Sequence, residues 1–261
     1  MADAKTLKSR LASGEFDARL KEVYLSDKAV EDQKKRDAVI IDEFVRLFGD
    51  NDSIELFSAP GRTVVGGNHT DHNHGKVLAA SVDLDTVAAA AKRDDGIIVE
   101  KSFKFDALEV DISDLEVHTE EFGKSSGLIR GMCAGFKERG YNIGGFNAAS
   151  MSRVLSGSGL SSSAAYEVLI GTILNHLYND GKVSPVEVAK IAQYAENKYF
   201  GKPCGLLDQT ASSVGSFITI DFKDPSRLLT RSILTLLPAA MRFVLSTRVE
   251  IIPTSPTIMR R

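Results

Sequence analysis

This 261-residue sequence has few cysteines, no excess of basic charge and no long apolar runs. Each of these features argues against a class of protein. Its two cysteines, Cys133 and Cys204, cannot form a disulfide framework, and neither belongs to a metal-type CxxC pair. The formal net charge of −3 argues against a nucleic-acid-binding protein, which is usually basic. Apolar runs such as "ILTLLPAAM" are too short to cross a bilayer, and the hydrophilic start has no apolar signal-peptide core. We therefore expect a cytoplasmic protein, monomeric by default, with neither nucleic acid nor membrane as a partner.

Residues 223–261 contain no glycine, although the preceding part of the chain holds all 21. This segment carries seven Lys/Arg against two Asp/Glu and four of the seven prolines, whereas residues 1–222 carry 25 Lys/Arg against 33 Asp/Glu. The change in composition predicts a boundary near Phe222. We expect residues 1–222 to form the folded domain and residues 223–261 to form an aberrant tail.

The order of hydrophobic patterns predicts helices and strands in alternation. A helical pattern runs to about Phe48, and "IELFSAPG" then predicts a short strand that ends in a Pro-Gly turn. Apolar runs between Lys76 and Ser102, broken by "RDDG", predict further strands, and "LIRGMCAGFKERG" predicts an amphipathic helix. Ser184, Pro185 and Glu187 form the pattern of a capping box at the start of a later helix.

The segment "GSGLSSSAA", residues 157–165, lies between a predicted strand, "FNAASMSRVL", and a predicted helix. Glycines let a backbone approach a ligand closely, and the first amides of a helix have no internal partner, so such a loop suits the phosphates of a nucleotide. It is not a Walker A loop, since it lacks the Gly-Lys-Ser/Thr ending, and Ser162 stands where the dinucleotide-binding pattern has its third glycine. The alternative from composition alone is a glycine-rich turn before a serine-capped helix.

Three motifs in order resemble the galactokinase family of the GHMP small-molecule kinases. "APGRTVVGGNHTDHNHG" (59–75) is similar to the family's sugar signature, "GSGLSSSAA" to its ATP-phosphate motif, and "AENKYFGKPCGLLDQTASSVG" (195–215) to the segment with its catalytic aspartate. The resemblance covers roughly residues 10–225. It implies an α+β fold, the N-terminal lobe of a two-lobe kinase with a mixed sheet and packed helices. The implied activity is ATP-dependent phosphorylation of galactose at C1, with ATP and Mg²⁺ as cofactors.

The histidine-rich turn "GGNHTDHNHG" admits three interpretations from its residues alone. A transition-metal site is one, because imidazole and carboxylate bind such ions, but the spacing matches no common metal module. A solvated loop is another. A sugar site fits better, since sugar hydroxyls need donors and acceptors on a rigid turn, and the resemblance implies that Arg62, His69 and Asp71 surround galactose.

Three residues of this turn depart from the family pattern. Asn68 replaces the usual glutamate, His72 a tyrosine and His74 a glycine. Asn68 can still bind a sugar hydroxyl but brings no charge, which leaves a related sugar such as N-acetylgalactosamine as an alternative substrate. His72 and His74 receive no role.

The resemblance makes Asp208 the base or the orienting group for the anomeric hydroxyl. Phosphoryl transfer through a loose transition state depends mainly on positioning and charge neutralisation, and Arg62 nearby would keep the carboxylate ionised. Gly205 would let the sugar approach the backbone. Without the resemblance, an aspartate before glutamine would be interpreted as a helix cap.

The implied nucleotide site includes the hydroxyl of Ser163 and the carboxylate of Glu196 around a magnesium ion, because Mg²⁺ prefers hard oxygen ligands. On pattern alone, Glu196 would be an ordinary surface charge. His118 and His176 are interpreted as structural and Cys204 as a packing residue. The expected phosphate-binding residues are Gly157, Ser158, Gly159, Leu160, Ser161, Ser162 and Ser163.

The family likeness ends after "ITIDFKDP". A shifted reading register of the codons for residues 237–260 can encode a segment like the one that follows this strand in the family, so we expect a frameshift between about Pro225 and Leu237. The second lobe would then be missing, and we expect weak or no turnover from this chain. A non-catalytic protein that binds sugar and ATP is the alternative of a different class, although the retention of Asp208 argues against it.

Overall fold

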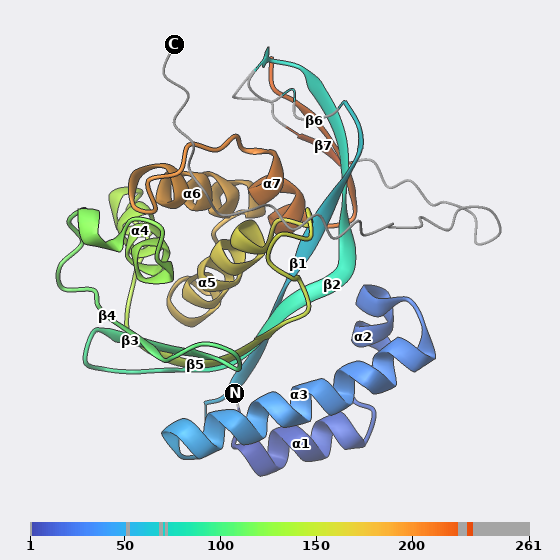
Figure 1. Cartoon of the computed structure of the whole chain (residues 1–261). Coiled ribbons are helices and arrows are strands. Elements are labelled where there is room, and N and C mark those ends of the chain that lie inside the picture. Colours follow the sequence, from blue (N-terminus) through green and yellow to red (C-terminus); the bar gives the residue numbers. More distant parts are fainter. Residues whose placement is uncertain (1, 51–52, 68–69, 71–72, 224–228, 232–261) are drawn as a thin grey trace.

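The computed structural model describes residues 2–50, 53–67, 70, 73–223 and 229–231, the last of these as backbone only. A single seven-stranded mixed sheet lies between two layers of helices (Figure 1). The strands are β1 (Glu55–Gly66), β2 (Lys76–Lys92), β3 (Ile97–Ser102), β4 (Leu108–Asp111), β5 (Phe146–Ser152), β6 (Phe217–Asp221) and β7 (Leu229–Arg231). The α-helices are α1 (Ala4–Ala12), α2 (Asp17–Tyr24), α3 (Asp27–Phe48), α4 (Ser125–Glu138), α5 (Ser162–Asn179), α6 (Pro185–Lys198) and α7 (Leu207–Val214).

The long strand β2 organises the sheet, whose order is β4-β3-β5-β2-β6-β7 with β1 also paired to β2. Residues 86–92 of β2 pair with β5, and residues 76–80 pair with β6. Between these two stretches, residues 81–85 of β2 pair with neither β5 nor β6. The phosphate loop predicted at residues 157–165 begins shortly after the end of β5. All the described pairings are antiparallel except β3 with β5, so the predicted mixed sheet is confirmed.

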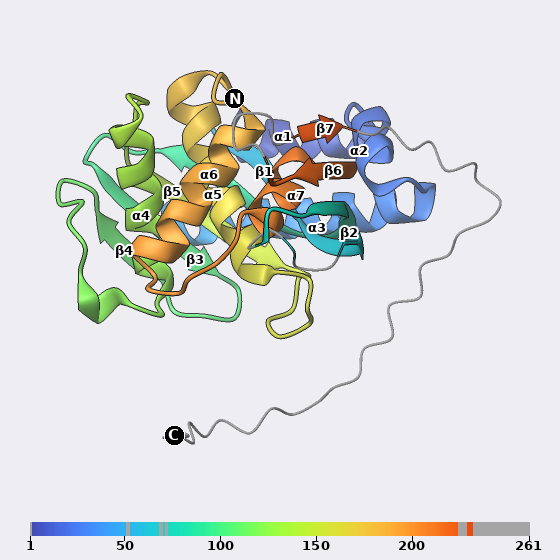
Figure 2. The ribbon, with the colours of Figure 1, turned by 90° about the horizontal axis from the view of Figure 1, so that it is seen from above.

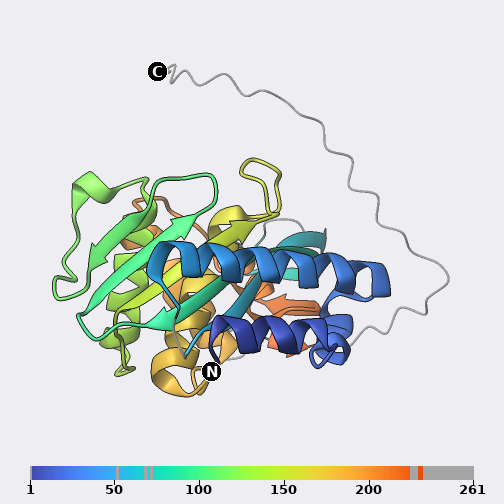
Figure 3. The same ribbon diagram turned by 90° about the horizontal axis from the view of Figure 1, so that it is seen from below.

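The two faces of the sheet are covered by different helices. Figure 2 shows α4, α5, α6 and α7 over one face, and Figure 3 shows α1 and α3 across the other. Strand periodicity explains the division, because successive side chains point to opposite faces. Along β2, Ala88 and Ala90 join the core beneath α5, whereas Val87, Ala89 and Ala91 pack against α1 and α3.

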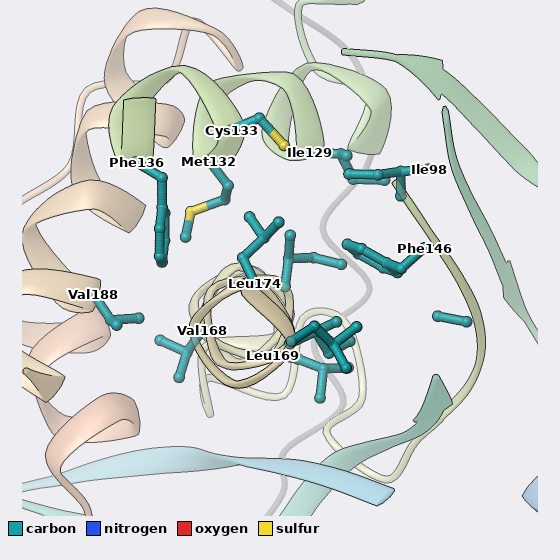
Figure 4. Close-up of a cluster of buried hydrophobic side chains, with 14 of the residues drawn as sticks. Ile98, Ile129, Met132, Cys133, Phe136, Phe146, Val168, Leu169, Leu174 and Val188 are labelled. Carbon is teal, nitrogen blue, oxygen red and sulfur yellow. The ribbon is translucent and has the colours of Figure 1, made fainter. Parts of the chain in front are cut away.

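The larger core lies between the sheet and helices α4, α5 and α6 (Figure 4). Phe136, Phe146 and Leu169 are almost completely buried there. The small residue Gly131 lets α4 approach α6 closely, because an added Cβ would lie 2.8 Å from the Cβ of Ala195. Burial on this scale fixes α5 and α6, and these two helices carry much of the candidate site.

The helix boundaries follow the sequence signals closely. Ser184 accepts a hydrogen bond from the amide of Glu187 at 3.2 Å, as a capping residue does. The Glu187 carboxylate instead pairs with Arg139 at 2.8 Å, so the predicted box is formed by its serine half. The predicted N-terminal helical region, the helix before Gly140 and the helix after the phosphate loop are all confirmed.

One prediction about β1 is wrong: the strand does not end at Pro60-Gly61. β1 continues to Gly66, and its register against β2 shifts between Pro60 and Arg62. The Pro-Gly pair forms an irregularity inside the strand, which is one of the few places where a sheet tolerates proline. This irregularity lies directly before Arg62.

The predicted boundary near Phe222 is followed by β7, whose backbone pairs with β6. The sheet therefore continues past that boundary. The proposed frameshift window and the remainder of the tail lie largely or wholly outside the described residues. Within the described part of the chain, no helix has the length and apolar character needed to span a membrane.

Candidate active site

Asp208 and Arg62 form the centre of the candidate site. Asp208 is the second residue of α7, and Arg62 lies on β1 just after its irregularity. The guanidinium donates to both carboxylate oxygens, from Nε at 2.6 Å and from Nη2 at 2.8 Å. The arginine side chain is 8% exposed and the aspartate side chain 29%, so the guanidinium is buried while the carboxylate is partly accessible to solvent. The guanidinium stabilises the ionised carboxylate.

The phosphate loop lies directly against this pair. Ser161 donates its hydroxyl hydrogen bond to Asp208, and the carbonyl of Gly159 accepts from Arg62 Nη1 at 2.7 Å. The backbone amide of Arg62 also donates to the carbonyl of Leu160 at 3.1 Å. Gly61 permits this approach, because an added Cβ would lie 2.9 Å from that carbonyl oxygen. The loop and the carboxylate therefore occupy one site, as the sequence argument requires.

The start of α5 is arranged differently from an ordinary serine-capped helix. Ser161 occupies the N-cap position in a left-handed conformation (φ 58°), and its side chain does not cap the helix. Its hydroxyl bonds Asp208 instead. Gly157 and Gly159 also have positive φ, and a Cβ on either would meet open space. This geometry leaves the positive end of α5 facing an open loop, which is a favourable environment for an anion.

A second carboxylate, that of Glu196 on α6, is hydrogen-bonded to Ser163 at the end of the loop. It is buried, with 2% exposure, so its interpretation as a surface charge is wrong. Its Oε1 accepts from the Ser163 hydroxyl at 3.3 Å and from the Lys202 ammonium at 3.0 Å. Its Oε2 accepts from the side-chain amide of Gln209 at 2.7 Å. Packing of α5 against α6 brings this carboxylate to the loop, which no local pattern in α6 could indicate.

Glu167 is a further buried acid beside this group. The same Gln209 amide donates to its Oε2 at 3.2 Å. Burial, together with the neighbouring negative charge of Glu196, raises the pKa of Glu167 well above its usual range. Sequence reasoning missed Glu167, Gln209 and Lys202. A glutamate inside the apolar repeat of α5 was the available signal for the first of these.

Of the other residues discussed in the sequence analysis of the sugar site, Gly205 and His74 are described by the structure. Gly205 lies in the connection between α6 and α7. Asn68, His69, Asp71 and His72 lie outside the described residues. The sugar contacts proposed for Asn68, His69 and Asp71 therefore stay predictions. His74 has a left-handed backbone (φ 55°), and its Nδ1 is 3.2 Å from the carbonyl oxygen of Phe222.

His118, His176 and Cys204 each contact neighbouring protein groups. The His118 ring is 2.9 Å from Asp114 Oδ2, and the His176 ring centroid is 6.1 Å from that of Phe57. Cys204 is half-buried, and its amide donates to Asn197 at 2.6 Å.

Comparison with known protein families places these elements together. The galactokinase galactose-binding signature matches residues 42–92, and the N-terminal domain of GHMP kinases matches residues 127–216. The first range includes Arg62 and the second includes both the phosphate loop and Asp208. The chain belongs to the galactokinase family.

Curated galactokinases and a solved structure agree with this membership. The chain is 37% identical over 179 residues to the galactokinase of Clostridium beijerinckii and 34% identical over 173 residues to that of Clostridium tetani. These matches cover 68% and 66% of this chain but 46% and 44% of the relatives. The chain thus spans less than half the length of the curated galactokinases it matches.

The structure of Lactococcus lactis galactokinase complexed with galactose superposes with a TM-score of 0.66 at 34% identity. It is matched over 72% of this chain and 49% of that chain. Mevalonate kinase from Methanococcus jannaschii, at 16% identity and a TM-score of 0.55, shares the fold. The predicted α+β GHMP kinase fold is therefore confirmed for this galactokinase-family chain.

Proposed function

We propose that this chain forms the galactose- and nucleotide-binding half of a galactokinase active site. The activity it serves is transfer of the γ-phosphoryl group of ATP to the C1 hydroxyl of galactose. One observation carries the proposal: the Asp208 carboxylate, held by Arg62, contacts Ser161 at the start of α5. An acceptor for a hydroxyl proton thus adjoins an anion-binding helix terminus, and phosphoryl transfer requires these two features to be neighbours.

Asp208 would orient the C1 hydroxyl and accept its proton. The carboxylate already accepts from Arg62 and Ser161, which fixes its position. A fixed carboxylate suits phosphoryl transfer, because a loose transition state demands positioning and charge neutralisation more than a strong nucleophile. Arg62 is placed to hold the carboxylate, and His69, Asp71, Asn68 and Gly205 are the proposed sugar-binding residues.

The loop residues Gly157 to Ser163 would bind the ATP phosphates through backbone amides and hydroxyls. The donor set of Ser163 and Glu196 fits Mg²⁺, which binds one or two hard oxygen ligands of a protein together with substrate phosphates. Among the described residues no group of three or more His, Cys, Asp or Glu side chains could hold a metal ion. Bound by Ser163 and Glu196, Mg²⁺ would neutralise the charge of the phosphates. Cytoplasmic ATP is the proposed source of the phosphoryl group.

The decisive experiment measures galactose 1-phosphate formed from galactose and MgATP by wild type and by Asp208→Asn, with calorimetry of galactose and ATP binding. We expect the variant to lose about 10²- to 10⁴-fold of whatever turnover the wild type shows, the usual contribution of a proton acceptor. Asp180→Asn, at an exposed position, is the matched control. Equal turnover by Asp208→Asn and wild type, or a wild type that binds neither ligand, contradicts the proposal.

The alternatives differ in the same measurements. Preference for N-acetylgalactosamine over galactose would assign the related sugar, which the uncharged Asn68 leaves open. Binding of both sugar and ATP without any turnover would assign a non-catalytic binding protein.

A further inference from the structure

Lys202 lies at the edge of the candidate nucleotide site, in the connection between α6 and α7. Its ammonium is 3.0 Å from Glu196 Oε1, the oxygen that also accepts from the Ser163 hydroxyl. The positive charge of Lys202 and the first turn of α5 are therefore bonded to the same atom. The lysine side chain is 60% exposed while the glutamate side chain is 3% exposed. The carboxylate is therefore buried, whereas much of the lysine side chain is exposed to solvent.

The backbone on both sides of Lys202 is held in place. Its amide donates to the carbonyl of Glu196 at 3.1 Å. Gly201 has φ 75°, and an added Cβ there would lie 2.7 Å from the Phe122 ring, so this turn requires glycine. The amide of Cys204 is bonded to Asn197 on α6 at 2.6 Å. Lys202 thus extends from a turn whose backbone is held by hydrogen bonds and close packing, and this fixes where its side chain begins, next to Glu196.

The charges around the loop explain why this lysine matters. Arg62, a second basic side chain at the loop, directs three of its nitrogens to Asp208 and to the carbonyl of Gly159. Its positive charge is already compensated by a carboxylate. The carboxyl groups of Glu196 and Asp208 also contact the loop, through Ser163 and Ser161, and an ionised carboxylate repels a polyphosphate. A second cation near Ser163 would offset that repulsion.

Extending the proposed function, we propose that Lys202 is a phosphate-binding residue for the terminal phosphates of ATP. The ammonium turns from Glu196 to the β- and γ-phosphate oxygens, so the site binds ATP even without a divalent ion. When a divalent ion occupies the Ser163–Glu196 position, Lys202 no longer bonds Glu196 and remains free for the phosphates. An ammonium on a flexible stem can serve in this way because its three donors adapt to either partner.

Calorimetry of the full chain with ATP and with AMP, both in EDTA, tests this inference. For Lys202→Met we expect metal-free ATP affinity to fall about tenfold, the effect of one charge-assisted hydrogen bond, and AMP affinity to change less than about twofold. Lys202→Arg should stay within about threefold of wild type for ATP. Lys198→Met is the matched control, since that lysine bonds Tyr194 instead. Thermal unfolding of each variant verifies that it folds.

The outcomes separate this inference from the proposed function. If wild type binds ATP and Lys202→Met binds it equally well, Lys202 is not a phosphate ligand although the nucleotide site stands. If Lys202→Met loses AMP affinity as much as ATP affinity, the contact is not to the terminal phosphates and the inference fails. A wild type that binds neither nucleotide in EDTA overturns this inference, and the proposed function falls as well only if that wild type also fails to bind MgATP and galactose.

Discussion

Two Arg–Asp pairs lie on the β1–β2 part of the sheet, and they differ in what surrounds the carboxylate. Arg36 on α3 pairs with Asp85 on β2, and each side chain is 3% exposed. Asp85 also accepts from the hydroxyls of Tyr24 at 2.5 Å and Ser58 at 2.6 Å. The Asp208 side chain in the other pair is 29% exposed.

The difference separates a structural ion pair from a candidate catalytic one. Asp85 is enclosed by protein donors, so its bonds serve to join α2 and α3 to the sheet. Asp208 has comparable anchors but a side chain that is 29% exposed, and a substrate hydroxyl could reach this exposed part. In these two cases, the exposure of the carboxylate distinguishes the structural ion pair from the candidate catalytic one, whereas the presence of an Arg–Asp pair alone does not.

The largest effect on stability is expected for Asp85→Asn. The substitution leaves the Arg36 guanidinium buried without its anion, so we expect the free energy of unfolding to fall by about 3–5 kcal/mol. Asp208→Asn should lower it by about 1 kcal/mol or less, because this carboxylate is 29% exposed and partly screened by solvent. Urea unfolding of both variants checks the comparison, with the exposed Asp83→Asn as control. Equal losses from Asp85→Asn and Asp208→Asn would remove the distinction drawn between the pairs.

Asp37→Asn sharpens the comparison by changing the charge near the buried pair. Burial raises the pKa of Asp37 to about 7, and Gln33 donates to it at 2.6 Å. Because the folded state holds this proton more tightly than the unfolded state does, the group lowers stability as pH rises from about 4 to about 7. We expect Asp37→Asn to be more stable than wild type at pH 8 by about 2–4 kcal/mol and nearly equal to it at pH 4.

The measurement for Asp37 is urea unfolding across pH 4 to 8. Asp32→Asn, on an exposed position of the same helix, is the control. A wild type and an Asp37→Asn variant with parallel pH profiles would mean that Asp37 stays ionised in the folded protein.

A smaller effect is expected on the active side of the comparison, at Gly61. An alanine there would place a Cβ 2.9 Å from the Leu160 carbonyl oxygen and 3.2 Å from both γ-carbons of Val154. We expect Gly61→Ala to cost about 1–3 kcal/mol and to weaken ATP binding several-fold, since it shifts the loop away from Arg62. Gly66→Ala on the same strand, where nothing lies within 4 Å, should be nearly neutral in both urea unfolding and calorimetry. Unchanged ATP affinity in Gly61→Ala would show that the loop adjusts freely.

Local signals in the sequence predicted the elements of the fold well. The strand, Gly/Ser loop and helix around residue 157 and the capping serine at 184 depend on nearby residues, and both are confirmed. The prediction that the first strand ends at Pro60-Gly61 was wrong, because pairing with β2 overrides the turn tendency of that dipeptide. Tertiary pairing decided this point, and no local pattern contains it.

The site shows the same division between local and long-range information. The resemblance to a family placed Asp208 and Arg62 together, although 146 residues separate them in the chain. The burial of Glu196 and the contact of Lys202 with it depend on how α5, α6 and the following turn pack. Such contacts arise from the three-dimensional arrangement, and a charged residue on an amphipathic helix does not reveal them.

The short helix α7 carries Asp208 and Gln209 as consecutive residues. Asp208 bonds Arg62 and Ser161, while Gln209 bonds Glu196 and Glu167. A hydrogen bond of 2.7 Å from Ser212 to the carbonyl of Pro60 ties the same helix to β1. Because one short helix contacts all of these groups, a displacement of α7 would act on the surroundings of Asp208, Glu196 and Glu167 together.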